Sequence, residues 1–225
     1  MSWAEVFKIN SNMKKPLNEQ MRDIKFQPIR IVTATGTFKP EKTGLYKVIC
    51  VGAGGKGESE QGSSYVYLAS GGGGGVAIKT LRLVSTTSYN VTVGTTASFT
   101  HESGSLSATA GTNGDTDSSA GGTGGTASGG DFNYNGSNGS YTYASSSNKT
   151  PTLTPGSVGV FISDLSRRGD SEWIVLDGVT HKLTYGDSIL GYGGSGNASG
   201  IYNGKGTFTS GLPAAVIIIP IEMEA

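Results

Sequence analysis

Four aromatic residues interrupt a tract that is otherwise almost only glycine, asparagine, serine and aspartate. They are Phe132, Tyr134, Tyr141 and Tyr143, and Tyr202 lies in a later glycine-rich tract. Rings among small amides and hydroxyls combine rigid stacking surfaces with adaptable hydrogen bonding, as in antibody paratopes. Such a surface suits sugar rings, so we predict a receptor-binding site for a glycan here. The alternative, that the rings shield the glycine-rich segments from water, stays open.

One glycine segment has the spacing of a nucleotide-binding loop, but its context differs. Gly52-Ala53-Gly54-Gly55-Lys56-Gly57 follows an apolar run. A dinucleotide loop needs a helix next and an acidic residue about 20 positions on. Here a β-like Tyr65-Val66-Tyr67 follows, and no acidic residue occurs between residues 61 and 100. The segment therefore predicts no nucleotide cofactor.

A second segment imitates the start of a calcium-binding loop. Asn113, Asp115 and Asp117 place side-chain oxygens at every second position. An EF-hand loop also needs glycine at its sixth position and glutamate at its twelfth, and these positions hold Ser118 and Gly124. We therefore predict a polar turn and no metal site.

The residues that could do catalysis are scattered. His101 and His181 lie far apart, with no ligand or base partner at a suitable spacing, and no nucleophile elbow is present. The one cysteine, Cys50, lies in a strand-like apolar run and predicts a packed small side chain rather than a nucleophile. We predict no catalytic residue and a protein that is not an enzyme. Paired carboxylates for glycoside cleavage stay an open alternative, because spatial pairs are invisible in sequence.

The composition excludes several partner classes. Glycine supplies 37 of 225 residues, more than twice the usual share of about 7%, and charged residues only 15%. The formal net charge is zero, so no overall field favours nucleic acid. A single cysteine excludes an internal disulfide. We see no signal peptide, and the longest apolar run, residues 214–219, is too short to cross a bilayer, so we expect no membrane insertion.

Residues 1–27 differ from the rest because they contain charges and no glycine. Ser2 and Glu5 have the capping-box spacing, and Pro16 suits the first turn of a second helix. The apolar positions of the two expected helices are Trp3, Val6, Phe7, Leu17, Met21 and Ile24. A stripe this narrow needs a partner to be stable. We therefore predict a helical attachment or oligomerisation segment, docked on its own domain or on other chains.

From residue 28 to residue 225 the pattern predicts one β-domain. Asp177-Gly178 separates two apolar runs, which is a strong hairpin signal, and the nearly all-apolar run before Pro220 predicts a central core strand. The expected strands are residues 29–33, 46–51, 76–84, 89–93, 106–110, 158–162, 173–176, 179–185 and 214–219.

Glycine tracts lie between these strands, chiefly at residues 52–57, 71–75, 111–140 and 191–206. They lack a strict every-third-residue repeat, which excludes a collagen triple helix. Flexible loops are one interpretation. We favour the other, in which extended polyglycine-II-type helices pack side by side, because only dense hydrogen bonding offsets the entropy lost on ordering so much glycine.

Most of the chain resembles a known class of proteins. Residues 1–11 with Lys15-Pro16-Leu17-Asn18 resemble the start of phage and prophage tail proteins of Gram-positive bacteria. Residues 44–55, 71–77 and 89–94 resemble the glycine-rich domain of such proteins, and also a tumour-necrosis-factor-like module of some receptor tyrosine kinases. The receptor modules use cysteines, and this chain has one. In composition the chain is also similar to tip adhesins of tailed phages.

The resemblance implies a jelly-roll-like β-sandwich with inserted glycine helices. It also implies a place in the virion tail, assembled in the bacterial host cytoplasm, with other tail or baseplate proteins as partners and often a homotrimer. We therefore predict a tail fibre or tip protein that binds a host cell-surface glycan. The alternative is a purely structural tail or baseplate protein without a host ligand.

Overall fold

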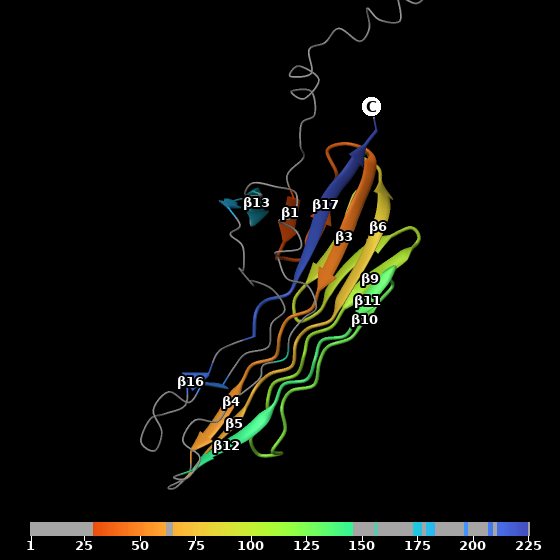
Figure 1. The fold of residues 1–225 in the computed structure, drawn as a ribbon. Coiled ribbons are helices and arrows are strands. Elements are labelled where there is room, and N and C mark those ends of the chain that lie inside the picture. The colour runs from red at the N-terminus through yellow and green to blue at the C-terminus, as the bar shows by residue number, and fades with distance from the viewer. Residues whose placement is uncertain are drawn as a thin grey trace, which may run out of the picture.

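Two facing β-sheets form one end of the molecule, and extended glycine-rich runs project from them (Figure 1). The computed structural model describes residues 29–61, 65–145, 156, 173–176, 179–182, 196–197, 207–208 and 211–224. These residues contain no helix, so the predicted all-β class is confirmed for them. The predicted segment 1–27, with its six apolar positions and its boundary, lies outside the described residues.

The larger sheet has seven strands and is mostly antiparallel; β1 pairs with β13 in parallel. In spatial order the strands are β11 (Phe132–Tyr134), β6 (Val76–Leu83), β3 (Gly44–Val51), β17 (Ala215–Met223), β1 (Ile29–Val32), β13 (Trp173–Leu176) and β14 (Val179–Lys182). The antiparallel pairing of β13 with β14 confirms the hairpin predicted around Asp177-Gly178. The strand expected at residues 158–162 lies outside the described residues.

The second sheet has five antiparallel strands and covers one face of the first. In order they are β10 (Ala127–Ser128), β9 (Gly104–Ala108), β8 (Ala97–His101), β7 (Tyr89–Val93) and β2 (Gly36–Phe38). Alternate side chains of each strand point into the space between the sheets. Tyr46, Val48, Val216, Val91 and Phe99 are all buried there. Burying each such side chain stabilises the fold by about 1.5–3 kcal/mol.

Strand β17 occupies the central position that its apolar sequence predicts. It lies between β3 and β1, and Val216, Ile217 and Ile218 are buried. We expected this strand to end at Pro220, but it continues to Met223. Proline is accommodated because the pairing with β3 shifts register between Pro220 and Glu222, and irregularities of this kind tolerate a missing backbone donor.

Five six-residue runs leave the two sheets and lie side by side. We name them run A (52–57), run B (70–75), run C (109–114), run D (121–126) and run E (135–140). Run A follows β3, run B leads into β6, run C follows β9, run D leads into β10 and run E follows β11. Figure 1 shows them extending together toward the opposite end of the molecule. Together they form what we call the glycine bundle.

Hydrogen bonds between the runs recur every third residue. Gly72 and Gly75 of run B donate to Thr112 and Thr109 of run C, while Ser70 and Gly73 donate to Ser140 and Ser137 of run E. Carbonyls of run B accept from Gly52 and Gly55 of run A and from Gly122 and Gly125 of run D. A three-residue period is that of the polyproline-II-type helix. For these runs, packed extended helices are confirmed and flexible loops are wrong.

At the far end, the runs lead into a third sheet of three strands, which we call the distal sheet. Its strands in order are β12 (Tyr141–Ser145), β5 (Tyr65–Ala69) and β4 (Glu58–Gln61). A two-stranded hairpin of β15 (Gly196–Asn197) and β16 (Thr207–Phe208) lies close to β5 and β4. The molecule therefore consists of a sandwich, a bundle and a small distal sheet in series.

Candidate functional site at the distal tip

Tyrosines from two strands share one face of the distal sheet. Successive residues of a strand point to opposite faces, so Tyr65 and Tyr67 of β5 lie on one side. Tyr143 of β12 is paired directly opposite Tyr67, which places Tyr141 and Tyr143 on the same side. We call the set Tyr65, Tyr67, Tyr141 and Tyr143 the tyrosine face.

The rings of the tyrosine face are close enough to form a continuous surface. The ring centroids of Tyr65 and Tyr67 are 4.6 Å apart, and those of Tyr67 and Tyr141 are 6.0 Å apart with nearly parallel planes. These spacings are typical of aromatic pairs that stabilise each other. Tyr65 and Tyr143 are 41% and 53% exposed, so the surface is open to solvent.

The hydroxyl of Tyr67, in the middle of this surface, is neutral at ordinary pH. Partial burial raises the pKa of Tyr67, and the neighbouring Tyr65 and Tyr141 and the carboxylate of Glu60 raise it further. A protonated phenol both donates and accepts hydrogen bonds. The face therefore combines ring surfaces with polar groups that can hold hydroxyl-bearing ligands.

Two carboxylates of β4 lie on the same side as the tyrosines. Glu60 is paired opposite Tyr67, and Glu58 opposite Ala69. Glu58 accepts hydrogen bonds from the backbone N–H and the hydroxyl of Thr116, at 2.9 and 3.2 Å. Glu60 is exposed and makes no hydrogen bond or ion pair with another described residue. Glu58 therefore anchors the neighbouring turn, and Glu60 faces solvent beside Tyr67.

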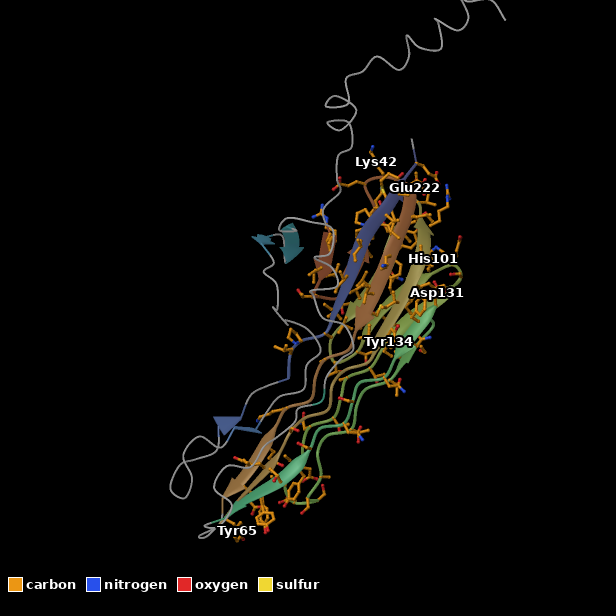
Figure 2. All side chains as sticks on the ribbon, in the orientation of Figure 1. Lys42, Tyr65, His101, Asp131, Tyr134 and Glu222 are labelled. Carbon is orange, nitrogen blue, oxygen red and sulfur yellow. The ribbon has the colours of Figure 1, made fainter. Side chains whose placement is uncertain are left out.

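The structure divides the aromatic site that we predicted. Tyr141 and Tyr143 belong to the tyrosine face, whereas Phe132 and Tyr134 lie on β11, an edge strand of the larger sheet. The six residues of run E separate the pairs by about 19 Å at 3.1 Å per residue. Figure 2 shows Tyr65 at the end of the molecule and Tyr134 beside the sandwich. Tyr202 lies outside the described residues.

The sequence interpretation missed Tyr65 and Tyr67 as partners in this site. They lie more than 70 residues before Tyr141 and Tyr143, and no local pattern connects the two pairs. A matching signal exists, because both pairs have the form Tyr-x-Tyr within three residues of a glycine run. In a strand, that spacing places both rings on one face.

The calcium-like segment is a polar turn. The carboxylate of Asp115 accepts hydrogen bonds from the backbone N–H groups of Asp117 and Ser118, at 3.0 and 3.2 Å. Asp115 and Ala120 also form an isolated bridge that closes the turn between runs C and D. The described residues contain no group of three or more acidic, histidine or cysteine side chains that could hold a metal ion.

The other residues that were candidates for chemistry lie in strands or runs, where they pack or form hydrogen bonds. Gly52–Gly57 forms run A and leads into strand β4, not into a helix. Cys50 is fully buried, and burial raises the pKa of its thiol to about 12. His101 ends β8 and stacks on Tyr89, with Nδ1 2.9 Å from the Ser103 hydroxyl. His181 lies in β14, opposite Ile174.

Comparison with known proteins identifies one family. A family model described as a glycine-rich domain matches residues 33–215. This range includes the second sheet, the glycine bundle and the distal sheet, and the larger sheet except for β1 and most of β17. No curated protein matches the chain. Over the residues described here, no helix is long and apolar enough to span a membrane.

Proposed function

The chain belongs to the glycine-rich domain family, and we propose that it is a bacteriophage tail fibre or tip protein that binds a host cell-surface glycan through its tyrosine face. In this proposal the protein is an adhesin and not an enzyme. Residues 1–27 attach it to other tail or baseplate proteins, the virion tail is its location, and three copies assemble in the bacterial host cytoplasm.

The observation that carries the proposal is the exposed tyrosine face at the distal end of the molecule. Sugar rings stack on aromatic side chains through their apolar faces, while tyrosine hydroxyls and nearby carboxylates bond the sugar hydroxyls. Tyrosine gives this contact area at a low entropic cost, because it has few rotatable bonds. The glycine bundle supports the proposal by holding the face away from the sandwich on hydrogen-bonded runs.

Binding of the purified full-length chain to a glycan array and to host cells tests the proposal. The double variant Tyr141→Ala with Tyr143→Ala removes half of the tyrosine face, and we expect it to lose at least tenfold in affinity, as removal of two stacking anchors predicts. The matched control is Phe132→Ala with Tyr134→Ala, which removes two exposed rings from β11 and leaves the distal sheet intact. We expect this control to bind normally.

Circular dichroism must show the same folded signal for both double variants. An array without any bound glycan, or equal host-cell binding by the two variants, overturns the proposal.

A second candidate function follows from the sandwich end of the molecule. Phe132 and Tyr134 are 60% and 48% exposed on β11, at an edge of the larger sheet. Among the described residues β11 pairs only with β6, and a strand edge with exposed rings is suited to pair with another chain. This arrangement favours a structural virion protein whose neighbours are further copies of the chain. Loss of the oligomer in Phe132→Ser with Tyr134→Ser, measured by analytical ultracentrifugation, together with no glycan binding by the natural chain, would favour it.

A further inference from the structure

We propose that the tyrosine face takes a glycan whose sugar carries a free ammonium group, with the sugar ring on the tyrosines and the ammonium group beside Glu60. This inference rests on the proposed glycan-binding function and specifies the charge of the ligand.

The first argument is the position of Glu60 within the tyrosine face. Glu60, Tyr67 and Tyr143 lie opposite one another on three neighbouring strands, so they form one row across the sheet. Side chains at such positions have Cβ atoms about 4.5–5.5 Å apart. A sugar stacked on Tyr67 therefore reaches the Glu60 carboxylate with a substituent of its ring.

The second argument is that the Glu60 carboxylate has no cation among the described residues. It forms no ion pair with them, whereas Glu58, in the adjacent row, is held by Thr116. An exposed carboxylate beside neutral rings attracts a positive charge, and the negative face of an aromatic ring attracts the same charge. The Glu60 carboxylate and the tyrosine rings therefore both favour a ligand with a positive charge.

The third argument is the charge around the tip. The described residues at this end include four carboxylates, Glu58, Glu60, Asp115 and Asp117, and one cation, Lys56. The field of these described residues is negative, and a negative field attracts cations and repels polyanions such as phosphate-linked polymers. A neutral sugar can still donate a hydroxyl hydrogen bond to Glu60, but it gains nothing from the charge of the carboxylate or from this field.

The test compares two oligosaccharides that differ only in charge. The probes are a glucosamine hexamer and its fully N-acetylated form, titrated into the full-length chain at about pH 5, where the amines of the sugar carry a proton. We expect the free amine form to bind at least about tenfold tighter at low salt, and this preference to shrink as salt is added. Tyr67→Ala is expected to weaken the binding of both forms.

Two charge variants show where the preference originates. We expect Glu60→Gln to reduce the preference for the amine form by about three- to fivefold, the effect of one exposed charge pair. The matched control is Glu222→Gln, an exposed carboxylate at the opposite end of the molecule, which removes the same charge and is expected to leave the preference unchanged.

The possible results separate this inference from the proposed function. Equal binding of the two hexamers, tighter binding of the acetylated form, or an equal effect of both charge variants overturns the inference. If neither hexamer binds but a neutral or anionic glycan on the array does, the inference is wrong and the glycan-binding function stands. If no glycan binds at all, both are wrong.

Discussion

Single glycines of run B lie where no side chain fits. Run B is buried along its whole length, and its bonds connect it to runs A, C, D and E. A Cβ atom on Gly72 would come within 3.0 Å of the Thr123 backbone, a contact that real Cβ atoms do not make. In the described residues, only Gly104 and Gly129 have a positive φ among the glycines. Gly72 is therefore required by the closeness of its neighbours and not by its own backbone angles.

Gly72→Ala should destabilise the protein because the added methyl group meets backbone that cannot rotate away. We expect a loss of about 1–3 kcal/mol in the free energy of unfolding, as for other overpacked sites. Urea denaturation, followed by far-ultraviolet circular dichroism, measures this loss of stability. The control is Gly36→Ala on β2, where an added Cβ meets nothing within 4 Å and stability should change by less than about 0.5 kcal/mol. Equal losses for the two variants would contradict the close-packing argument.

Asp115 should couple the order of the distal turn to pH. Hydrogen bonds from the side chain and backbone N–H of Ser118, and from the N–H of Asp117, lower the pKa of the Asp115 carboxyl. A lowered pKa stabilises the folded turn fully above the ordinary carboxyl value of about 3.9, and this contribution is lost as pH falls through the lowered value. We expect the amide NMR signals of Asp117 and Ser118 to shift together in that acidic range.

The substitution Asp115→Asn provides the control for this titration. Asparagine keeps an acceptor oxygen for the turn but carries no ionisable group. The joint acidic shift of the two amide signals should therefore disappear in this variant. Its persistence would show that the titration does not belong to Asp115.

Among the runs, run D shows how a three-residue sequence repeat builds an element. Its successive backbone donors point in three directions, which the polyproline-II-type period repeats. The first set bonds carbonyls of run B, the second bonds threonine hydroxyls of run C, and the third bonds asparagine side chains of run E. The donors are Gly122 and Gly125, then Thr123 and Thr126, then Gly124 and, just beyond run D, Ala127 of β10.

Thr112→Val removes one hydrogen bond between runs C and D without changing the shape of the side chain. The Thr112 hydroxyl accepts a hydrogen bond from the Thr123 backbone N–H at 2.7 Å. Loss of such an acceptor costs about 0.5–1.5 kcal/mol and should speed hydrogen exchange at the Thr123 amide. Thr112→Ser keeps the hydroxyl and should retain slow exchange. If the Thr123 amide exchanges as slowly in Thr112→Val as in Thr112→Ser, the Thr112 hydroxyl does not protect it.

The elements that sequence predicts best are those whose pattern is local. Strands β3, β6 and β17 are recognisable in the sequence because their runs of β-branched and apolar residues indicate a buried strand, whichever strands they pair with. Strand β4 was missed because Glu58–Gln61 has no apolar pattern, and pairing with β5 alone makes it a strand. The glycine runs also contain a local three-residue repeat, Gly-Gly-Thr twice in run D and Asn-Gly-Ser twice in run E.

The tyrosine face was predictable only in part, for a related reason. Tyr141 and Tyr143 stand out in their tract, but their neighbours Tyr65 and Tyr67 come from a different hairpin. The two pairs of tyrosines come together because runs B and E lie side by side in one register, and this register exists only in the folded chain. Phe132 and Tyr134 are near Tyr141 in sequence and far from it in space, because run E is fully extended.

Across the whole molecule, one pairing register continues from the sandwich through the bundle to the tip. Val51 pairs with Val76 in the sandwich, Gly55 bonds Gly72 in the bundle, and Glu58 pairs with Ala69 in the distal sheet. Neither strand gains or loses a residue along the way. The hairpin of β9, runs C and D and β10 behaves in the same way, from Ala108 paired with Ala127 to Asp115 paired with Ala120.

This continuity predicts that run lengths must match. Deleting residues 112–114 from run C alone should shift the pairing of run C with run D out of register. We expect this variant to lose the cooperative unfolding transition. Deleting residues 112–114 together with 121–123 shortens both runs by one turn, about 9 Å. This matched deletion restores the register but removes the hydrogen bonds between Glu58 and Thr116. We expect the matched deletion to fold with a lowered melting temperature.

Thermal unfolding followed by near-ultraviolet circular dichroism compares the two deletions with the natural chain, and limited proteolysis at residues 115–120 reports on the turn. The matched variant removes twice as many residues, so a simple loss of contacts would make it the less stable of the two. Register continuity requires the opposite order, because a hairpin out of register loses pairing along its entire length beyond the deletion. A matched variant that melts below the unmatched one would show that the runs act as independent tethers, and that the tip is positioned by contacts of its own.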